Sequence, residues 1–206
     1  MPERTTGYRR STGSERGEAR RKELLDLVTD DLAANGLVDF SLRRAARAAG
    51  TTHKVLLYYF DGAEDLLAQA VYRLRERRIV PALAATASEG VPQTLADRVR
   101  AAAQVLLAEE FGLRRVLDQA MGLAMYDPGR YGGLGREATQ QYLPGLVTLC
   151  PADWSDRRKR EVAELILATL RGFTTEQLFS DDTEGITAGL EALLRALDRE
   201  EAAGDG

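Results

Sequence analysis

The amino-acid sequence predicts an all-α protein, and three observations support this fold class. Apolar residues recur at helical spacing in most segments, and residues suited to helix ends separate those segments. No short window alternates apolar and polar residues with enrichment in β-branched side chains, as a half-buried strand would. No self-similar repeat of about 20 to 50 residues is visible, so a repeat array is not expected.

Composition narrows the possible functions. The chain has 206 residues, of which 44% are apolar, 29% charged and 6% aromatic, enough to build one or two soluble domains. It contains neither the run of about eighteen apolar residues that spans a membrane nor the apolar stretch of a secretion signal. We therefore expect a cytoplasmic protein without a membrane partner.

The counts of cysteine and histidine exclude much catalytic and metal chemistry. Cys150 is the only cysteine and His53 the only histidine, so an internal disulfide, a thiolate cluster and a multi-histidine zinc site are impossible. A catalytic triad could use only one imidazole. We expect no metal, no cofactor and no enzyme activity.

Charge is divided unevenly along the chain. Residues 1–60 contain 11 Lys or Arg against 8 Asp or Glu, whereas residues 61–206 contain 17 against 24. A basic N-terminal segment on an acidic body is consistent with a polyanion partner at that end. An excess this small also occurs on ordinary solvated surfaces.

The N-terminal segments are predicted from their caps and apolar spacing. Residues 1–17 hold almost nothing apolar and predict a disordered arm. A helix is expected from residue 18 until Asn35 and Gly36, a pair suited to a helix end. Ser41 can then cap a short helix that ends at Gly50, and Thr51 or Thr52 can cap another that reaches residue 60.

The rest of the chain is predicted to be helical with one long loop. Asp61 and Glu64 open a fourth helix, which Pro81 closes or kinks. Further helices are expected over residues 92–110, 112–126, 138–149, 156–179 and 183–200. Residues 127–136 contain four glycines and a proline, which predicts a loop. Because no strand precedes these glycines and their spacing is wrong, a phosphate-binding loop is not expected.

Residues 41–60, SLRRAARAAGTTHKVLLYYF, carry the most informative pattern. Small residues lie where the two short helices would cross, at Ala45, Ala46 and Ala49, and Gly50 lies in the turn. Polar residues open the second helix, at the end that enters the major groove in a helix-turn-helix. The pattern predicts a helix-turn-helix; a three-helix packing motif without DNA binding is the alternative.

Residues 18–71 resemble the TetR family of bacterial repressors, and the remaining chain resembles it more loosely. The matching residues, in order and without gaps, are Asn35, Gly36, Ser41, Ala48, Ala49, Gly50, Leu56, Tyr59, Phe60, Glu64, Asp65, Leu66 and Leu67. Two positions differ. Leu57 stands where the family usually has tyrosine, and Ala63 where it usually has a phosphate-binding lysine.

The resemblance implies DNA contacts at particular positions. Base edges would be faced by Arg43, His53, Lys54, Val55 and Tyr58, and phosphates by Ser41, Thr52 and Tyr59, with Leu56 and Phe60 in the core. The side-chain chemistry agrees, since Arg43 can donate two hydrogen bonds to guanine and Lys54 can reach the same acceptors. Val55 or Leu57 can contact a thymine methyl group.

Other basic residues allow two interpretations. Arg44 and Arg47 either contact DNA or only solvate their helix. The arm residues Arg4, Arg9 and Arg10 either enter a minor groove or screen phosphates.

The last two expected helices have two apolar faces each, so each should be buried on two sides. On the first, one stripe comprises Val162, Leu165, Ile166, Thr169 and Phe173, and the second Ala163, Leu167, Leu170, Thr174 and Leu178. On the other helix, Ile186, Leu190, Leu193 and Leu197 lie beside Gly189, Ala192 and Ala196. The family dimerises through four helices here, which implies an interface of Val162, Ile166, Phe173, Ile186, Leu190, Leu193 and Leu197. The alternative is that both helices lie in a monomer's core.

The family encloses a small-molecule pocket within the helices between Pro92 and Leu149. Candidate lining residues are Met121, Met125, Tyr126, Tyr142 and Phe173, with Gln140, Gln141 or Gln177 as polar anchors. Ordinary core packing is the alternative for each.

Together these features predict an N-terminal three-helix helix-turn-helix domain, residues 18–63 after the arm of residues 1–17, and a ligand-binding and dimerisation domain of residues 64–206. The expected function is a ligand-responsive transcriptional regulator, a homodimeric repressor that a small-molecule effector releases from a palindromic double-stranded DNA operator. Two alternatives remain: a helical sensor that has lost DNA binding, and a helical enzyme that uses carboxylates in an apolar cavity.

Overall fold

The computed structural model describes residues 14–87, 93–108, 111–180 and 182–203. Within these ranges the regular elements are nine α-helices and no strand, which confirms the all-α prediction. The helices are α1 (Glu15–Asn35), α2 (Leu42–Ala48), α3 (His53–Tyr59), α4 (Ala63–Ala84), α5 (Leu95–Leu107), α6 (Phe111–Tyr126), α7 (Pro128–Val147), α8 (Asp156–Glu176) and α9 (Thr183–Ala202). The arm arginines Arg4, Arg9 and Arg10 and the expected helix start at Pro92 lie outside the described residues.

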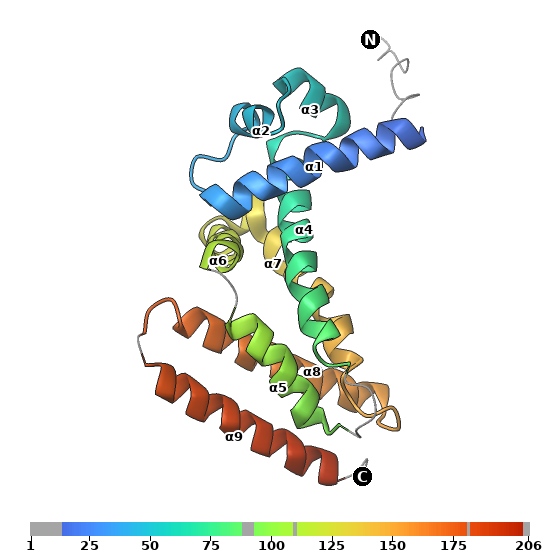
Figure 1. Cartoon of the computed structure of the whole chain (residues 1–206), viewed down its shortest axis with the longest axis vertical. Helices are drawn as coiled ribbons and strands as arrows, with labels where there is room; N and C mark the ends of the chain where they lie inside the picture. The colour runs from blue at the N-terminus through green and yellow to red at the C-terminus, as the bar shows by residue number, and fades with distance from the viewer. Residues whose placement is uncertain (1–13, 88–92, 109–110, 181, 204–206) are drawn as a thin grey trace.

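The helices form two groups joined by α4 (Figure 1). At one end of the molecule α1 crosses beneath α2 and α3, and at the other end α5, α8 and α9 lie together. Between them α4 descends from the first group beside α6 and α7. The protein is therefore elongated, with α4 connecting its two ends.

Two large apolar cores match these groups. The first includes Leu24, Val28, Ala45, Leu56, Leu66, Leu74, Val116 and Leu134, from α1, α2, α3, α4, α6 and α7. The second includes Leu95, Val99, Trp154, Ile166, Leu194 and Leu197, from α5, α8, α9 and the segment before α8. The first core contains residues from both sides of position 63, so it does not mark a boundary at that position. The domain boundary after residue 63 stays a prediction.

Helix starts follow the predicted caps closely. Ser155 and Asp182 cap α8 and α9, and α1 begins at Glu15, earlier than expected, because the Ser14 side chain accepts a hydrogen bond from the Gly17 amide. α4 continues through Pro81 to Ala84, so this proline does not close the helix.

The loop predicted over residues 127–136 is wrong, because α7 runs through it. Asp127 accepts a hydrogen bond from the Arg130 amide at 3.0 Å, and Pro128 occupies the first turn, where its missing N–H costs nothing. A Cβ at Gly135 would lie 3.6 Å from the Ala124 Cβ and 3.7 Å from the Met121 Sδ, so this glycine lies in the α6–α7 contact. Packing against α6 therefore outweighs the poor helix propensity of the glycines.

Candidate functional site

The turn between α2 and α3 has the geometry that the sequence predicts. The Ser41 and Thr52 side chains accept hydrogen bonds from the Arg44 and Val55 amides, at 3.3 and 3.4 Å, and so begin α2 and α3. Gly50 between them has φ +58°, a left-handed conformation that favours glycine. Ala45, Ala46 and Ala49 are buried, as close helix packing requires.

The exposed surface of α3 carries most of the residues predicted to contact DNA. His53 and Lys54 are exposed at its first turn, and Val55 and Leu57 are 36% and 50% exposed. Leu56 is fully buried and anchors the helix. Tyr58 and Tyr59 are half-buried at its end, with ring centroids 4.9 Å apart in an edge-to-face arrangement.

The two neighbouring arginines of α2 have different environments. Arg43 is exposed and makes no hydrogen bond or ion pair with any residue that the structure describes. Arg44 instead donates from Nε to the Asp31 Oδ2 at 2.8 Å and from Nη1 to the Val38 carbonyl at 2.7 Å. Arg44 therefore ties α2 to the end of α1, while Arg43 and the exposed Arg47 lie on the outer surface.

Arg21, which the sequence did not single out, holds α3 against α1 and α4. Its Nε donates to the Tyr59 carbonyl at 3.4 Å, its Nη2 donates to the Gln69 Oε1, and its guanidinium lies 5.1 Å from the centroid of the Phe60 ring. Arg21 of α1 therefore links the end of α3 to Gln69 of α4.

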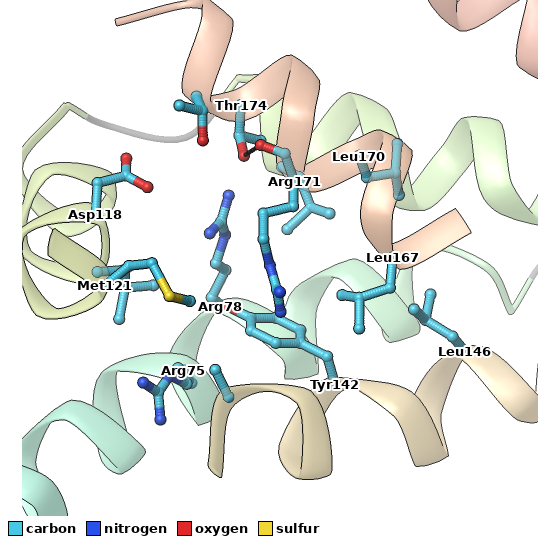
Figure 2. Close-up of a pocket in the computed structure, with 14 residues that line it drawn as sticks. Arg75, Arg78, Asp118, Met121, Tyr142, Leu146, Leu167, Leu170, Arg171 and Thr174 are labelled. Atoms are coloured by element: carbon cyan, nitrogen blue, oxygen red, sulfur yellow. Dashed lines mark hydrogen bonds between the residues drawn. The ribbon is translucent and has the colours of Figure 1, made fainter. Parts of the chain in front are cut away.

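A cavity of about 110 Å³ is lined by residues of α4, α5, α6, α7 and α8 (Figure 2). Its walls combine apolar and charged side chains: Arg75, Arg78, Leu106, Leu117, Asp118, Met121, Ala138, Tyr142, Leu146, Leu167, Leu170, Arg171, Thr174 and Thr175. About 10–15 Å³ suffices for one water molecule, so the cavity can hold a small ligand.

Burial shapes the electrostatics of this cavity. Arg75 is only 3% exposed, and burial lowers the pKa of its guanidinium; its Nη2 donates to the Leu134 carbonyl at 2.6 Å. Among the described residues, no hydrogen-bond acceptor meets the buried Nη1 of Arg75 or the buried Nη2 of Arg171. Burial raises the pKa of Asp118, and the charges of Arg78 and Arg114 only partly oppose this shift.

The described residues contain no cluster of three or more His, Cys, Asp or Glu side chains suited to a metal ion. No helix within the described ranges is long and apolar enough to cross a membrane.

Comparison with known proteins gives related sequences and folds. No protein-family model matches the chain. It is 28% identical over 156 residues to the HTH-type transcriptional regulator BetI of Rhizobium meliloti (strain 1021), an alignment that covers 71% of this chain and 74% of BetI.

Solved structures resemble the chain over most of its length. A protein of Streptomyces coelicolor A3(2) described as a transcriptional regulator has a TM-score of 0.67 and 22% identity, covering 86% of this chain and 98% of its own. A Rhodococcus protein described as a TetR-family transcriptional regulator has a TM-score of 0.66 and 16% identity, covering 88% and 97%. The multidrug binding protein EbrR, complexed with imidazole, has a TM-score of 0.62 and 21% identity, covering 86% and 94%.

The chain has the TetR fold. This result confirms the resemblance that residues 18–71 carry and the all-α fold class that the whole sequence predicts. Figure 1 shows α3 at one end of the molecule. The residues that line the cavity come from α4, α5, α6, α7 and α8, and none comes from α3.

Within this TetR fold, the predicted pocket residues separate into two sets. Met121 and Tyr142 line the cavity. Met125 and Tyr126 are 76% and 88% exposed and do not line it. Phe173 packs with the second core, where a Cβ at Gly189 would lie 2.8 Å from the Phe173 ring.

Two of the three predicted polar anchors have partners outside the cavity lining, and the third is exposed. Gln177 accepts a hydrogen bond from the Arg114 Nη1 at 2.7 Å, and Gln141 donates to the Tyr72 carbonyl at 2.9 Å, while Gln140 is exposed. The charged lining residues Arg75, Arg78, Asp118 and Arg171 were not predicted from the sequence. A signal existed for Arg171, which follows Leu167 by four residues and so interrupts the second apolar stripe of α8.

Most residues predicted to form this protein's dimer interface are buried within the single chain. Val162, Ile166, Ile186, Leu190, Leu193 and Leu197 are at most 8% exposed and belong to the core of one chain, and Phe173 packs against α9. These side chains therefore pack within one chain, and their part in a dimer interface stays a prediction. The outward faces of the same helices carry Leu165, which is 51% exposed, and the exposed small residues Ala168, Gly172, Ala188 and Ala192.

Proposed function

We propose that this protein is a transcriptional regulator that binds double-stranded DNA through α2 and α3 and acts as a homodimeric repressor released by a small-molecule effector. The observation that carries the proposal is the first turn of α3, where His53 and Lys54 are exposed while Leu56 on the same helix is fully buried. Side chains at the N-terminal end of a recognition helix reach base edges in the major groove.

The chemistry of this surface fits a duplex. The Arg43 guanidinium, which has no partner among the described residues, can donate two hydrogen bonds to a guanine edge. Val55 and Leu57 offer apolar contact to thymine methyl groups. The capping hydroxyls of Ser41 and Thr52 lie at helix N-termini, where backbone N–H groups favour phosphate.

Selection of bound fragments from random double-stranded DNA, followed by gel shifts at several salt concentrations, tests this function. We expect an inverted repeat with half-sites about 34–36 Å apart. Affinity for a matched and a scrambled site should fall steeply with salt, by a slope of about 0.9 for each phosphate contact. Binding of small molecules with no specific DNA binding would favour the sensor alternative instead.

Position 63 provides a finer test. Ala63 begins α4 after Gly62, where the family usually has a phosphate-binding lysine. Ala63→Lys should raise affinity for matched and scrambled DNA equally and steepen the salt dependence by about one phosphate contact. Unchanged affinity for both would show that phosphate lies out of reach of this position.

The outward faces of α8 and α9 support the dimer proposal. Leu165 is exposed there, and Gly172 has no described atom within 4 Å of its Cβ position, so a partner helix could approach closely. Leu165→Glu should convert the dimer to a monomer in analytical ultracentrifugation. Val80→Glu, at another exposed apolar residue, is the matched control and should leave the assembly intact.

Two helices support the proposed coupling of ligand to DNA. α4 carries Arg75 at the cavity and Leu66 in the first core. α6 carries Asp118 at the cavity, and the next residue, Gln119, accepts a hydrogen bond at Oε1 from the Leu37 amide at 2.8 Å. Displacement of either helix would therefore move the DNA-binding helices and change the separation of the two recognition helices in the dimer. Coupling of about 1–3 kcal/mol would lower DNA affinity some 5- to 150-fold, and DNA would weaken ligand binding equally.

A further inference from the structure

The charge of the cavity lining is strongly one-sided. Arg75, Arg78 and Arg171 contribute three guanidinium groups, and Asp118 contributes one carboxylate. Arginine stays protonated in almost any protein site, so the described lining carries a net positive charge. Buried positive charge is costly unless a counter-charge meets it.

Asp118 does not supply that counter-charge fully. Its Oδ2 is buried without a hydrogen-bond partner among the described residues, and burial raises its pKa. Figure 2 shows Asp118 on the α6 side of the cavity, whereas Arg171 extends from α8 toward the ring of Tyr142. No hydrogen bond or ion pair joins Arg171 to Asp118 within the described part of the chain.

Two of the guanidinium groups retain unused donors. Arg75 is only 3% exposed, and its Nη1 has no hydrogen-bond acceptor among the described residues. The Nη2 of Arg171 is also buried without one, although Arg171 lines the cavity. Planar guanidinium donors pair best with a carboxylate or another oxyanion.

The rest of the lining is mostly apolar, with Thr174, Thr175 and the Tyr142 hydroxyl as its polar groups. Five leucines line the cavity: Leu106, Leu117, Leu146, Leu167 and Leu170. The volume of about 110 Å³ is below the roughly 300–1,000 Å³ of pockets for drug-sized ligands, and an apolar cavity of about 150 Å³ holds benzene. The ligand should therefore combine a small apolar body with a negative group.

We propose that the cavity binds a small carboxylate with an apolar body the size of one ring or a short chain, and that Arg171 is its principal anchor. Arg75 supplies a second positive group, and the leucines contact the apolar body. This inference rests on the proposed ligand-responsive function and names the chemical class of its effector.

Isothermal titration calorimetry on the full chain without DNA tests the proposal with probes of nearly equal shape. Benzoate is negative, benzamide neutral and benzamidinium positive; hexanoate and hexanamide repeat the comparison with a flexible chain. We expect each carboxylate to bind about 10- to 100-fold more tightly than its amide, the range of one hydrogen bond to a charged group. Benzamidinium should bind more weakly than benzamide.

Three variants assign the effect. Arg171→Met should remove the preference for benzoate over benzamide, and Arg171→Lys should retain part of it because the charge remains. Arg136→Met, at an exposed arginine of α7, is the matched control and should leave the preference unchanged. Circular dichroism spectra and thermal unfolding confirm that each variant is folded.

Four outcomes would overturn the proposal. The first three are equal binding of the three benzene derivatives, tighter binding of benzamidinium, and a benzoate preference that survives Arg171→Met. The fourth is the absence of benzoate and hexanoate binding up to about 10 mM, which is weak even for a small ligand. Gel shifts with the selected DNA are measured separately. A protein that binds DNA but no carboxylate refutes this inference alone, and one that binds benzoate but no DNA refutes the proposed function alone.

Discussion

Replacing Arg44 by alanine should destabilise the protein without changing which DNA sequence it prefers. The guanidinium donates to the Asp31 Oδ2 at 2.8 Å, to the Val38 carbonyl at 2.7 Å and to the Asp31 carbonyl at 3.4 Å. Arg44→Ala removes all three contacts at once, and they join α2 to the end of α1 and to the segment between them.

The expected loss follows from the burial of the pair. The side chains of Arg44 and Asp31 are 14% and 17% exposed, so their ion pair lies between an exposed pair, worth about 0.2–1 kcal/mol, and a buried pair, whose disruption costs about 3–5 kcal/mol. The carbonyls released by Arg44→Ala can bind water at this partly open site. We expect a loss of about 1.5–3 kcal/mol, which lowers the urea midpoint by about 0.5–1 M at a slope of about 3 kcal/mol/M.

Arg43→Ala is the matched control on the same helix. Arg43 is exposed and has no partner among the described residues, so its removal should change stability by less than about 0.5 kcal/mol. It should instead relax discrimination at one base pair by about 1–3 kcal/mol in competition gel shifts. A double-mutant cycle of Arg44→Ala with Asp31→Ala should give a coupling energy of at least about 0.5 kcal/mol.

Equal stability losses in the two arginine variants would refute this reasoning, because burial would then not distinguish them. A changed base preference in Arg44→Ala would also refute it. Folded fractions measured under the gel-shift conditions separate a general loss of affinity from a loss of sequence preference.

Three further predictions concern the packing and ionisation of other residues. Gly112→Ala should lower the unfolding free energy by about 1–3 kcal/mol in urea titrations, because the new Cβ would lie 2.9 Å from the Ala33 carbonyl oxygen. At Gly122 on the same helix, a Cβ would have no described atom within 4 Å, so Gly122→Ala should stabilise the protein by about 0.5–1 kcal/mol. Equal effects would contradict the close α1–α6 approach. Cys150 is 7% exposed and burial raises its pKa, so it should react with a disulfide reagent at least about tenfold more slowly in the folded protein than in urea; similar rates would show that the thiol is accessible. Burial raises the pKa of Asp118, so the native state holds a proton that the unfolded chain releases, and stability falls as pH rises through that interval. The stability advantage of Asp118→Asn should therefore shrink as pH falls from about 7 to about 4, and an advantage independent of pH would contradict the raised pKa.

Local signals explain why the helix-turn-helix could be predicted from the sequence. The caps at Ser41 and Thr52 and the left-handed turn at Gly50 each depend on residues within a few positions of one another. The buried anchors Leu56 and Phe60 follow from helical spacing in the same segment. A short segment therefore contains nearly all the information that fixes this part of the structure.

The start of α7 and the occupants of the α8–α9 core depend on contacts that no local pattern contains. Gly135 favours a loop by propensity, yet it permits close packing against Ala124 in a helix that α6 stabilises. The apolar stripes on α8 and α9 predict that each helix is buried on two sides. They do not show whether α5 or a second chain covers each face. In the structure, α5 packs in one core with Ile166 of α8 and Leu197 of α9.

The arginines show most clearly where sequence patterns end. Arg43, Arg44, Arg75 and Arg171 all lie in predicted helices and all have the same ordinary charge. Their surroundings differ. Arg44 pairs with the Asp31 carboxylate thirteen residues earlier, and Arg75 donates to the Leu134 carbonyl fifty-nine residues later. The buried Nη2 of Arg171 meets no acceptor among the described residues. Three-dimensional packing therefore separates the arginine proposed to contact DNA, the one that stabilises the fold and the one proposed to bind a ligand. Substituting them one at a time measures these three roles separately.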